Sequence, residues 1–444
     1  MVKKLFGTSG IRGKIGSEVT CELALNVGKS LAYYLKNQGT VVIGYDTRTT
    51  NQMLDQAICA GLLESGVNVV KIGMVPTPLV GYATLKLNAD AGIMLTASHN
   101  PSHYNGIKLW NKNGMAYSSS QEAEIEKIYS EKAYTSVSWD KIGKLSINSQ
   151  IKGQYIDDLV NLVDIKKGLK VVIDCASGAG SEISPLVFRK AGCDVTTLNS
   201  QADGFFPGRN PEPNEENLQT LMKTVVAIGA DLGIAHDGDA DRMITIDEKG
   251  NISPFDSLLA LMSREFKGDI VTTVDAGLCM DESVEGEVLR TKVGDVNIAE
   301  VIIEKNASFG GEPSGTWLHP DFCMCPDGIL SGLRMAELVS KKGKLSDLLS
   351  EIPSYPNIRE KITCSKEEKV KVMENMDELL RDAFDDIIDV NDIDGLRLTF
   401  SDDSWLLVRP SGTEDYVRIT LESRDLKRAE HIRDVCVKLI KESL

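Results

Sequence analysis

Three aspartates alternate with small residues in the segment Asp237-Gly238-Asp239-Ala240-Asp241-Arg242, directly after an apolar run. Carboxylate oxygens at this spacing suit a hard cation such as Mg²⁺ or Ca²⁺. A solvated acidic turn would explain one Asp-x-Asp pair, but three carboxylates followed by arginine favour a metal site. An EF-hand does not fit, because its sixth loop position needs glycine and here holds Arg242, and because residues 243–246 predict a strand. Mg²⁺ is favoured over Ca²⁺, because Mg²⁺ usually binds only a few protein ligands and leaves room for a phosphate oxygen.

A serine stands in the polar segment Thr96-Ala97-Ser98-His99-Asn100-Pro101, which follows the apolar run Ala91–Leu95. A serine on a tight turn at the end of a strand is accessible, and a neighbouring polar group could activate it as a nucleophile. The same composition is also common in ordinary turns and helix caps. The nearby Asn105-Gly106-Ile107-Lys108 predicts a tight turn that returns Lys108 to the face of the serine.

The segment Gly310-Gly311-Glu312-Pro313-Ser314-Gly315-Thr316 is too rich in glycine and polar residues to predict a strand or a helix. Glycines let the backbone approach a ligand closely, and the side chains of Glu312, Ser314 and Thr316 can hydrogen-bond hydroxyl groups. A simple connecting turn would explain the segment equally well.

Two further loops carry the groups that bind phosphate. Arg409-Pro410-Ser411-Gly412-Thr413, with Arg418 on the next predicted strand, offers hydroxyls, backbone N–H groups and a guanidinium. Near the N-terminus, Gly7-Thr8-Ser9-Gly10-Ile11-Arg12-Gly13 offers the same ingredients. Either loop could also be a plain connection.

The elements that must position these loops form an α/β pattern. Short Val/Ile runs at residues 40–46, 170–175 and 269–275 each predict a strand, followed by a helical stretch and a second strand. A third strand then ends in one of the loops 96–101, 236–242 or 310–316. The sequence therefore predicts three copies of one β-α-β-α-β plan with mixed, mostly parallel sheets. In such sheets ligands bind beyond the carboxyl ends of the strands, which favours one site shared by the three loops.

The chain of 444 residues predicts several domains. From about residue 365 the pattern changes to a charged amphipathic helix (366–384), the stretch 388–400, strands at 405–408 and 416–422, and a closing helix (426–441), which predicts a smaller α+β domain. The predicted domains are residues 1–152, 153–252, 253–364 and 365–444.

Composition narrows the class of partner. The net charge of −16 disfavours nucleic acid, because neutralising phosphates needs a basic face, but a few arginines can still bind a small anion.

Nine scattered cysteines argue against a disulfide framework, and Cys323-Met324-Cys325 lacks the spacing of a zinc site. No segment has the roughly 20 apolar residues of a membrane span. The first residues lack the apolar core of a signal peptide, so we expect a cytoplasmic protein that binds neither nucleic acid nor membrane.

Taken together and in this order, the five polar segments resemble those of the α-D-phosphohexomutase family, and the resemblance covers essentially the whole chain. It implies four domains around a central cleft, and an enzyme, monomer or homodimer, that interconverts hexose 6-phosphates and hexose 1-phosphates. It also implies Mg²⁺, a phosphoserine and a hexose 1,6-bisphosphate that serves as intermediate and activator. The loops at 7–13 and 310–315 look most like the archaeal phosphoglucosamine-mutase branch, which favours glucosamine phosphate.

The resemblance assigns a role to each matching residue. Ser98 matches the serine that carries the phosphoryl group and gives one metal ligand, while Asp237, Asp239 and Asp241 give the others. Residues around the reacting phosphoryl group are Arg12, His99 and Lys108, with Lys108 as the proposed acid/base. Substrate contacts fall on Arg242, Glu312, Ser314, Thr316, Arg409, Ser411, Gly412, Thr413 and Arg418.

Two positions depart from the family pattern, and three other functions stay open. Thr316 stands where many members have histidine, and Asp415 stands where many have proline. The alternatives are a phosphomannomutase or phosphoglucomutase, a metal-dependent phosphatase that uses the same serine and aspartates, and a non-catalytic sugar-phosphate-binding protein.

Overall fold

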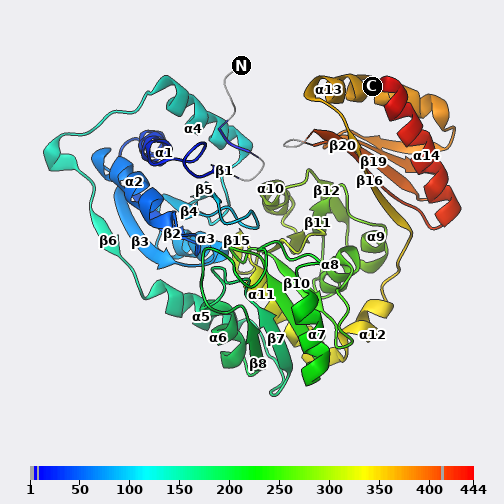
Figure 1. Ribbon diagram of the computed structural model, residues 1–444, viewed down its shortest axis with the longest axis horizontal. Coiled ribbons are helices and arrows are strands. Elements are labelled where there is room, and N and C mark those ends of the chain that lie inside the picture. Colours follow the sequence, from blue (N-terminus) through cyan, green and yellow to red (C-terminus); the bar gives the residue numbers. More distant parts are fainter. Residues whose placement is uncertain (1–4, 8–9, 412–414) are drawn as a thin grey trace. The chain divides into compact units, whose positions relative to one another are not determined.

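The computed structural model describes residues 5–7, 10–411 and 415–444. These residues form two compact units, one of Met1–Phe255 with Ser314–Ser350 and one of Asp256–Pro313 with Glu351–Leu444. The ribbon in Figure 1 labels their helices and strands. Among the described helices, none is both long and apolar enough to cross a membrane.

The first unit begins with a six-stranded mixed sheet in the order β1-β5-β4-β2-β3-β6. Strands β2, β3, β4 and β6 run parallel, whereas β5 is antiparallel to both β4 and β1. Apolar side chains of α1 and α2 pack with those of the strands in one buried core. The elements are β1 (Ile11–Lys14), α1 (Cys21–Tyr34), β2 (Thr40–Tyr45), α2 (Asn51–Glu64), β3 (Asn68–Met74), α3 (Thr77–Lys86), β4 (Ala91–Leu95), β5 (Tyr104–Asn111), α4 (Ser119–Glu131), η1 (Trp139–Lys141) and β6 (Leu145–Ile147).

A four-stranded sheet follows in the order β10-β9-β7-β8, parallel except for the β9–β10 hairpin. The unit is completed by the antiparallel strands β14 and β15 and by α11, whose N-terminus is capped by the Asp327 side chain. The elements are α5 (Ile151–Asn161), β7 (Lys170–Asp174), α6 (Ile183–Lys190), β8 (Asp194–Leu198), α7 (Gln219–Ile228), β9 (Leu232–His236), β10 (Met243–Ile246), β14 (Trp317–His319), β15 (Cys323–Pro326), α11 (Gly328–Lys342) and α12 (Leu345–Ser350).

The second unit contains three parallel strands in the order β12-β11-β13 and a five-stranded antiparallel sheet in the order β16-β20-β19-β18-β17. Helices α13 and α14 contribute apolar side chains to the core of the antiparallel sheet. The elements are α8 (Phe255–Ser263), β11 (Ile270–Thr273), α9 (Cys279–Ser283), β12 (Val288–Thr291), α10 (Asp295–Lys305), β13 (Phe309–Gly311), β16 (Asn357–Thr363), α13 (Lys366–Ala383), β17 (Ile387–Asn391), β18 (Leu396–Phe400), β19 (Trp405–Pro410), β20 (Tyr416–Glu422) and α14 (Leu426–Ser443).

The predicted β-α-β-α-β plan is confirmed in all three places. It appears as β2-α2-β3-α3-β4, as β7-α6-β8-α7-β9 and as β11-α9-β12-α10-β13. In each copy the first strand lies between the other two and runs parallel to both. The third strands end at the loops that carry Ser98, Asp237 and Glu312, as the sequence predicts.

Two local predictions are wrong. Gly310 and Gly311 belong to strand β13 rather than to a loop, because they pair in parallel with Val271 and Thr272 of β11. A Cβ on Gly310 would lie 2.7 Å from the Ile298 side chain, so glycine at this position allows α10 to pack closely. Asn105 and Gly106 lie within strand β5 rather than in a tight turn. The division at residues 152, 252 and 364 stays a prediction.

Candidate active site

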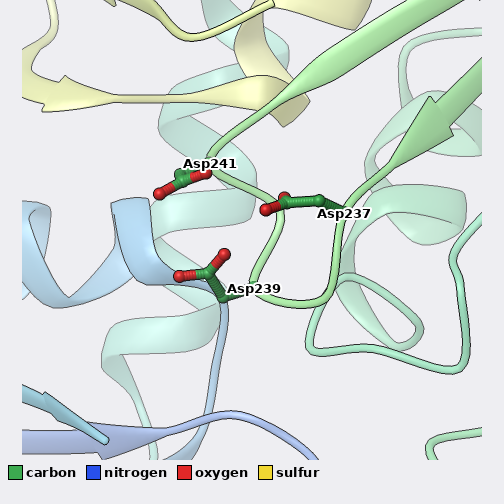
Figure 2. Close-up of side chains that lie close together, drawn as sticks. All are labelled: Asp237, Asp239 and Asp241. Atoms are coloured by element: carbon green, nitrogen blue, oxygen red, sulfur yellow. The ribbon is translucent and has the colours of Figure 1, made fainter. Parts of the chain in front are cut away.

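The three aspartates of the loop between β9 and β10 gather their carboxylates at one point. Asp237, Asp239 and Asp241 are buried, and they offer oxygen atoms that all lie within 4.8 Å of one another. Figure 2 shows the three side chains turned toward a common space from one short loop. This convergence follows from the sequence, because residues at alternate positions of a loop that curls after a strand can face the same side.

Ser98 lies against this cluster. Its hydroxyl donates to Asp237 Oδ2 at 2.6 Å, and the side chain is buried. The backbone of Ser98 has φ of +48°, in the left-handed region that a serine adopts at a cost. A Cβ on Gly238 would lie 2.5 Å from the Ser98 carbonyl oxygen, so glycine allows the aspartate loop to pack directly on the serine loop.

Lys108 enters the cluster from strand β5. Its Nζ donates to Asp239 Oδ2 at 3.0 Å and to Asp241 Oδ2 at 2.9 Å. Burial alone would lower the pKa of Lys108, but the two carboxylates outweigh burial and raise it above its ordinary value. The predicted return of the lysine to the face of Ser98 is therefore present, although a strand rather than a turn carries it.

The surroundings shift the pKa values of Asp237 and Asp239 in opposite directions. Burial, together with the negative charges of Asp241 and Asp239, raises the pKa of Asp237 well above its ordinary value. Burial acts in the same direction on Asp239, but the Lys108 ammonium and a hydrogen bond from Thr77 lower its pKa. Because these acids are close neighbours, a proton on one depends on the charge of the others.

The cluster has the oxygen ligands that a hard metal ion needs. Asp239 Oδ1 and Asp241 Oδ1 are buried and accept no hydrogen bond from the described residues. Arg242 Nε lies 4.0 Å from Asp241 Oδ1. Burying a carboxylate oxygen that accepts no hydrogen bond costs free energy, and a bound cation offsets that cost. The residues thus fit a metal site of the kind the sequence predicts.

Thr77 is a member of the site that the sequence analysis missed. Its hydroxyl donates to Asp239 Oδ2 at 2.6 Å, and its backbone N–H donates to the Asp239 carbonyl oxygen at 2.9 Å. Thr77 is the first residue of α3, and the threonine belongs to no polar motif that would have drawn attention. Its role depends on a contact across 162 positions of the chain.

Two more predicted residues lie around Ser98. His99 Nδ1 is 3.2 Å from Ser98 Oγ, and Arg12 Nη1 donates to Asn100 Oδ1 at 3.4 Å. Burial, reinforced by the charges of Arg242 and Arg12, lowers the pKa of His99 to about 2, so its imidazole is neutral. Burial also lowers the pKa of Arg12.

Glu212 was not predicted, yet it lies beside two predicted residues. Its carboxylate lies 3.6 Å from His99 Nε2 and 3.6 Å from Arg242 Nη1. It comes from the segment Pro211-Glu212-Pro213. The charged residue between two prolines is the one sequence signal that could have identified it.

Part of the predicted sugar loop reaches this unit. Thr316 is buried and forms a β-bridge with Arg242, while Ser314 Oγ donates to Thr316 Oγ1 at 3.2 Å. The backbone therefore brings Thr316 beside the residue that follows the aspartates.

The other predicted substrate residues belong to the second unit. Glu312 Oε1 accepts from the Gly294 N–H at 2.8 Å. Arg409 and Arg418 are paired opposite each other on β19 and β20, and Asp394 binds Arg409 Nε at 2.9 Å. Two neighbouring guanidinium groups repel each other and favour an anion. Ser411 accepts a hydrogen bond at its carbonyl oxygen from Lys369 Nζ at 3.0 Å, and the predicted residues Gly412 and Thr413 lie outside the described residues.

Comparison with known proteins covers the whole chain. Four family models match in order, described as Phosphoglucomutase/phosphomannomutase alpha/beta/alpha domain I (residues 3–136), domain II (153–250), domain III (254–355) and C-terminal domain (361–439). These matches confirm the predicted fold class of three α/β domains and a distinct C-terminal domain.

Similar proteins agree with the family models. A probable phosphoglucosamine mutase of Methanobrevibacter smithii is 83% identical over 443 residues, which cover 100% of both chains. Another, of Methanothermobacter thermautotrophicus, is 58% identical and covers 97% of this chain and 96% of its own. A crystal structure of a phosphoglucomutase/phosphomannomutase family protein from Burkholderia thailandensis has a TM-score of 0.89 at 28% identity, covering 99% of this chain and 97% of its own.

Proposed function

The chain belongs to the phosphoglucomutase/phosphomannomutase family of α-D-phosphohexomutases, and we propose that it interconverts glucosamine 6-phosphate and glucosamine 1-phosphate through a phosphorylated Ser98. One contact carries the proposal. The Ser98 hydroxyl is 2.6 Å from a carboxylate of a buried three-aspartate cluster, which is the arrangement a phosphoryl carrier beside a cation requires.

The choice of glucosamine rests on the relatives. The proteins that are 83% and 58% identical to this chain are both named probable phosphoglucosamine mutases. Mannose and glucose phosphates are the alternative substrates within the family.

The nine cysteines are all free, which supports the cytoplasmic location expected from the sequence.

In the proposed reaction the bond between phosphorus and Ser98 Oγ breaks as a new bond forms to the free O1 or O6 of the sugar phosphate. The proton that the sugar hydroxyl loses replaces the one that Ser98 Oγ gains, and we assign Lys108 as the group that gives a proton to Oγ and recovers one from the sugar hydroxyl. As an ammonium held by Asp239 and Asp241, Lys108 would also stabilise the departing oxygen. The resulting bisphosphate then presents its other phosphate to Ser98, and the same steps run in reverse.

We assign Mg²⁺ to Ser98, Asp237, Asp239 and Asp241, where it would neutralise charge on the phosphoryl oxygens. The burial of Ser98 and the aspartates excludes water, which protects a phosphoserine from hydrolysis. Arg12 adds a second positive group near the transferring phosphoryl.

Substrate binding is assigned to the remaining predicted residues. Glu312, Ser314 and Thr316 would hold sugar hydroxyls, and Arg242 lies beside Thr316. Arg409, Ser411 and Arg418 would bind the phosphate that does not react, because guanidinium groups and hydroxyls match its geometry.

The test is a ³¹P NMR assay of the purified protein with Mg²⁺ and a trace of hexose 1,6-bisphosphate. Glucosamine, glucose and mannose 6-phosphates are compared under the same conditions. We expect the 1-phosphate to form, fastest from glucosamine 6-phosphate. Release of inorganic phosphate without a 1-phosphate would indicate a phosphatase instead, and faster turnover of glucose or mannose phosphate would overturn the choice of sugar.

A further inference from the structure

A buried arginine, Arg48, stands directly beneath the serine loop, and neither the motifs nor the family resemblance gave it a role. Its side chain has 0% exposure, and every one of its five N–H groups has an acceptor. The acceptors are Asp46 Oδ2 (3.1 Å from Nε), the carbonyl oxygens of Pro101 (2.7 Å) and Tyr104 (2.9 Å) for Nη1, and those of Ser98 (2.9 Å) and Asn100 (2.6 Å) for Nη2.

Four of these five acceptors are backbone carbonyls of the segment 98–104. One rigid, planar group therefore fixes the direction of four peptide units that surround the reactive serine. The guanidinium also lies over the Phe206 ring, 5.1 Å from its centroid. Lysine could not reproduce this pattern, because its ammonium has three donors at a single point rather than a planar fork.

Asp46 anchors the arginine and the start of the loop together. Besides Arg48 Nε, its carboxylate accepts from the Arg48 backbone N–H at 2.8 Å, from Asn51 Nδ2 at 2.7 Å and from Thr96 Oγ1 at 2.6 Å. Thr96 Oγ1 in turn accepts the Ser98 N–H at 2.8 Å. A continuous set of buried hydrogen bonds thus connects the end of β2 to the serine.

This support matters because the Ser98 backbone is strained. A non-glycine residue at φ of +48° persists only when its surroundings hold it there. The Ser98 carbonyl oxygen is bound by Arg48 on one side, and Gly238 of the aspartate loop packs against it on another. With the carbonyl fixed in this way, Oγ points to Asp237.

The next domain contains a second arrangement of the same design. Arg209 Nε binds Asp174 Oδ1 at 3.0 Å, and its Nη2 donates to the carbonyl oxygen of His236 at 2.6 Å, one residue before Asp237. Asp174 ends β7 as Asp46 follows β2, so an Asp–Arg pair next to the first strand supports each of the two functional loops.

We propose that Arg48 is a positioning residue for phosphoryl transfer, which holds Ser98 Oγ in line with the aspartate cluster by binding the carbonyl groups of its loop; this inference rests on the proposed function. A displacement of about 1 Å in a reacting atom can cost roughly 100-fold in rate. Loosening the loop should therefore slow phosphoryl transfer while leaving sugar binding, which other residues provide, nearly unchanged.

The test compares wild type with Arg48→Lys and with the milder Asp46→Asn, which keeps the shape of the anchor. Arg189→Lys is the control, since Arg189 makes one long hydrogen bond to the Val195 carbonyl oxygen at 3.4 Å on the surface. Circular dichroism and thermal unfolding establish the folded fraction of each variant. Steady-state kinetics then give kcat and KM, and mass spectrometry follows the rate at which hexose 1,6-bisphosphate phosphorylates Ser98.

For folded Arg48→Lys we expect kcat and the rate of Ser98 phosphorylation to fall together by about 10- to 100-fold, with KM within about threefold of wild type. Asp46→Asn should show a smaller loss of the same kind. Unchanged kcat per folded molecule, or a loss confined to KM or to thermal stability, would overturn the inference. A wild-type protein that never phosphorylates Ser98 would instead overturn the proposed function, so the two failures are distinguishable.

Discussion

Replacing Lys108 by methionine should destabilise the metal-free protein strongly. The Lys108 side chain is 8% exposed and bridges Asp239 (0%) and Asp241 (11%) at 3.0 and 2.9 Å. Methionine fills nearly the same space but leaves both carboxylates buried without their cation. Breaking a buried pair in this way costs about 3–5 kcal/mol, a large part of a typical folding free energy of roughly 5–15 kcal/mol.

The pH dependence of this loss follows from the two pKa shifts. The pKa of Lys108 is raised, so its contribution is fully present below the ordinary lysine value of about 10.4 and is lost as pH rises above it. The pKa of Asp239 is lowered, so its contribution is present above the ordinary value of about 3.9 and is lost as pH falls below it. The difference between wild type and Lys108→Met should therefore be largest between about pH 4 and pH 10.

The assay is urea unfolding followed by circular dichroism, in chelator and in excess Mg²⁺. Because a divalent cation would supply the missing positive charge, Mg²⁺ should stabilise Lys108→Met more than it stabilises wild type. Lys86→Met is the matched control, since the Lys86–Asp158 pair is 40% and 33% exposed and should contribute only about 0–1 kcal/mol. A metal-free Lys108→Met within about 1 kcal/mol of wild type at pH 7 would refute the reasoning.

Three further substitutions test other parts of the structure. Thr77→Val removes the 2.6 Å hydrogen bond to Asp239, and we expect isothermal titration to show metal affinity about 10- to 100-fold weaker; unchanged affinity would contradict a role for Thr77 at the metal site. Asp327, which caps α11 and accepts from the Tyr155 hydroxyl at 2.7 Å, has its pKa raised to about 6 by burial, so its contribution to stability falls as pH rises from about 4 to 6. Asp327→Asn should remove about 2 to 2.5 kcal/mol of that decline in urea unfolding at pH 4 and 7, and an unchanged slope would show that the carboxyl is not perturbed. Arg409→Ala should lower kcat/KM for a hexose monophosphate by a factor equivalent to about 1.5–3 kcal/mol, and equal kinetics would remove Arg409 from the proposed phosphate site.

The sequence predicted the parts of the site that are local in the chain. Asp237, Asp239 and Asp241 share one loop, and their alternation alone indicated a metal site. Ser98 could be proposed because a polar turn follows an apolar strand. The repeated β-α-β-α-β pattern placed these loops at equivalent strand ends, and the structure confirms that order.

What the sequence could not predict depends on contacts between distant segments. Thr77 meets Asp239 across 162 positions, and Arg48 meets the carbonyl oxygens of residues 50 to 56 positions later, with no motif to mark either. The strand at Gly310 was missed because glycine disfavours strands. Pairing with β11 forms the strand, and the close approach of α10 explains why glycine stands there. Tertiary packing overrode local preference there.

Phosphorylation of Ser98 is the most direct test of the proposed chemistry. The purified protein is incubated with a hexose 1,6-bisphosphate carrying labelled phosphate, and the label is mapped by peptide mass spectrometry in wild type and in Ser98→Ala. We predict label on Ser98 of the wild type, none on the variant, and loss of mutase activity with it. Label on a different residue, or full mutase turnover by Ser98→Ala, would contradict the account.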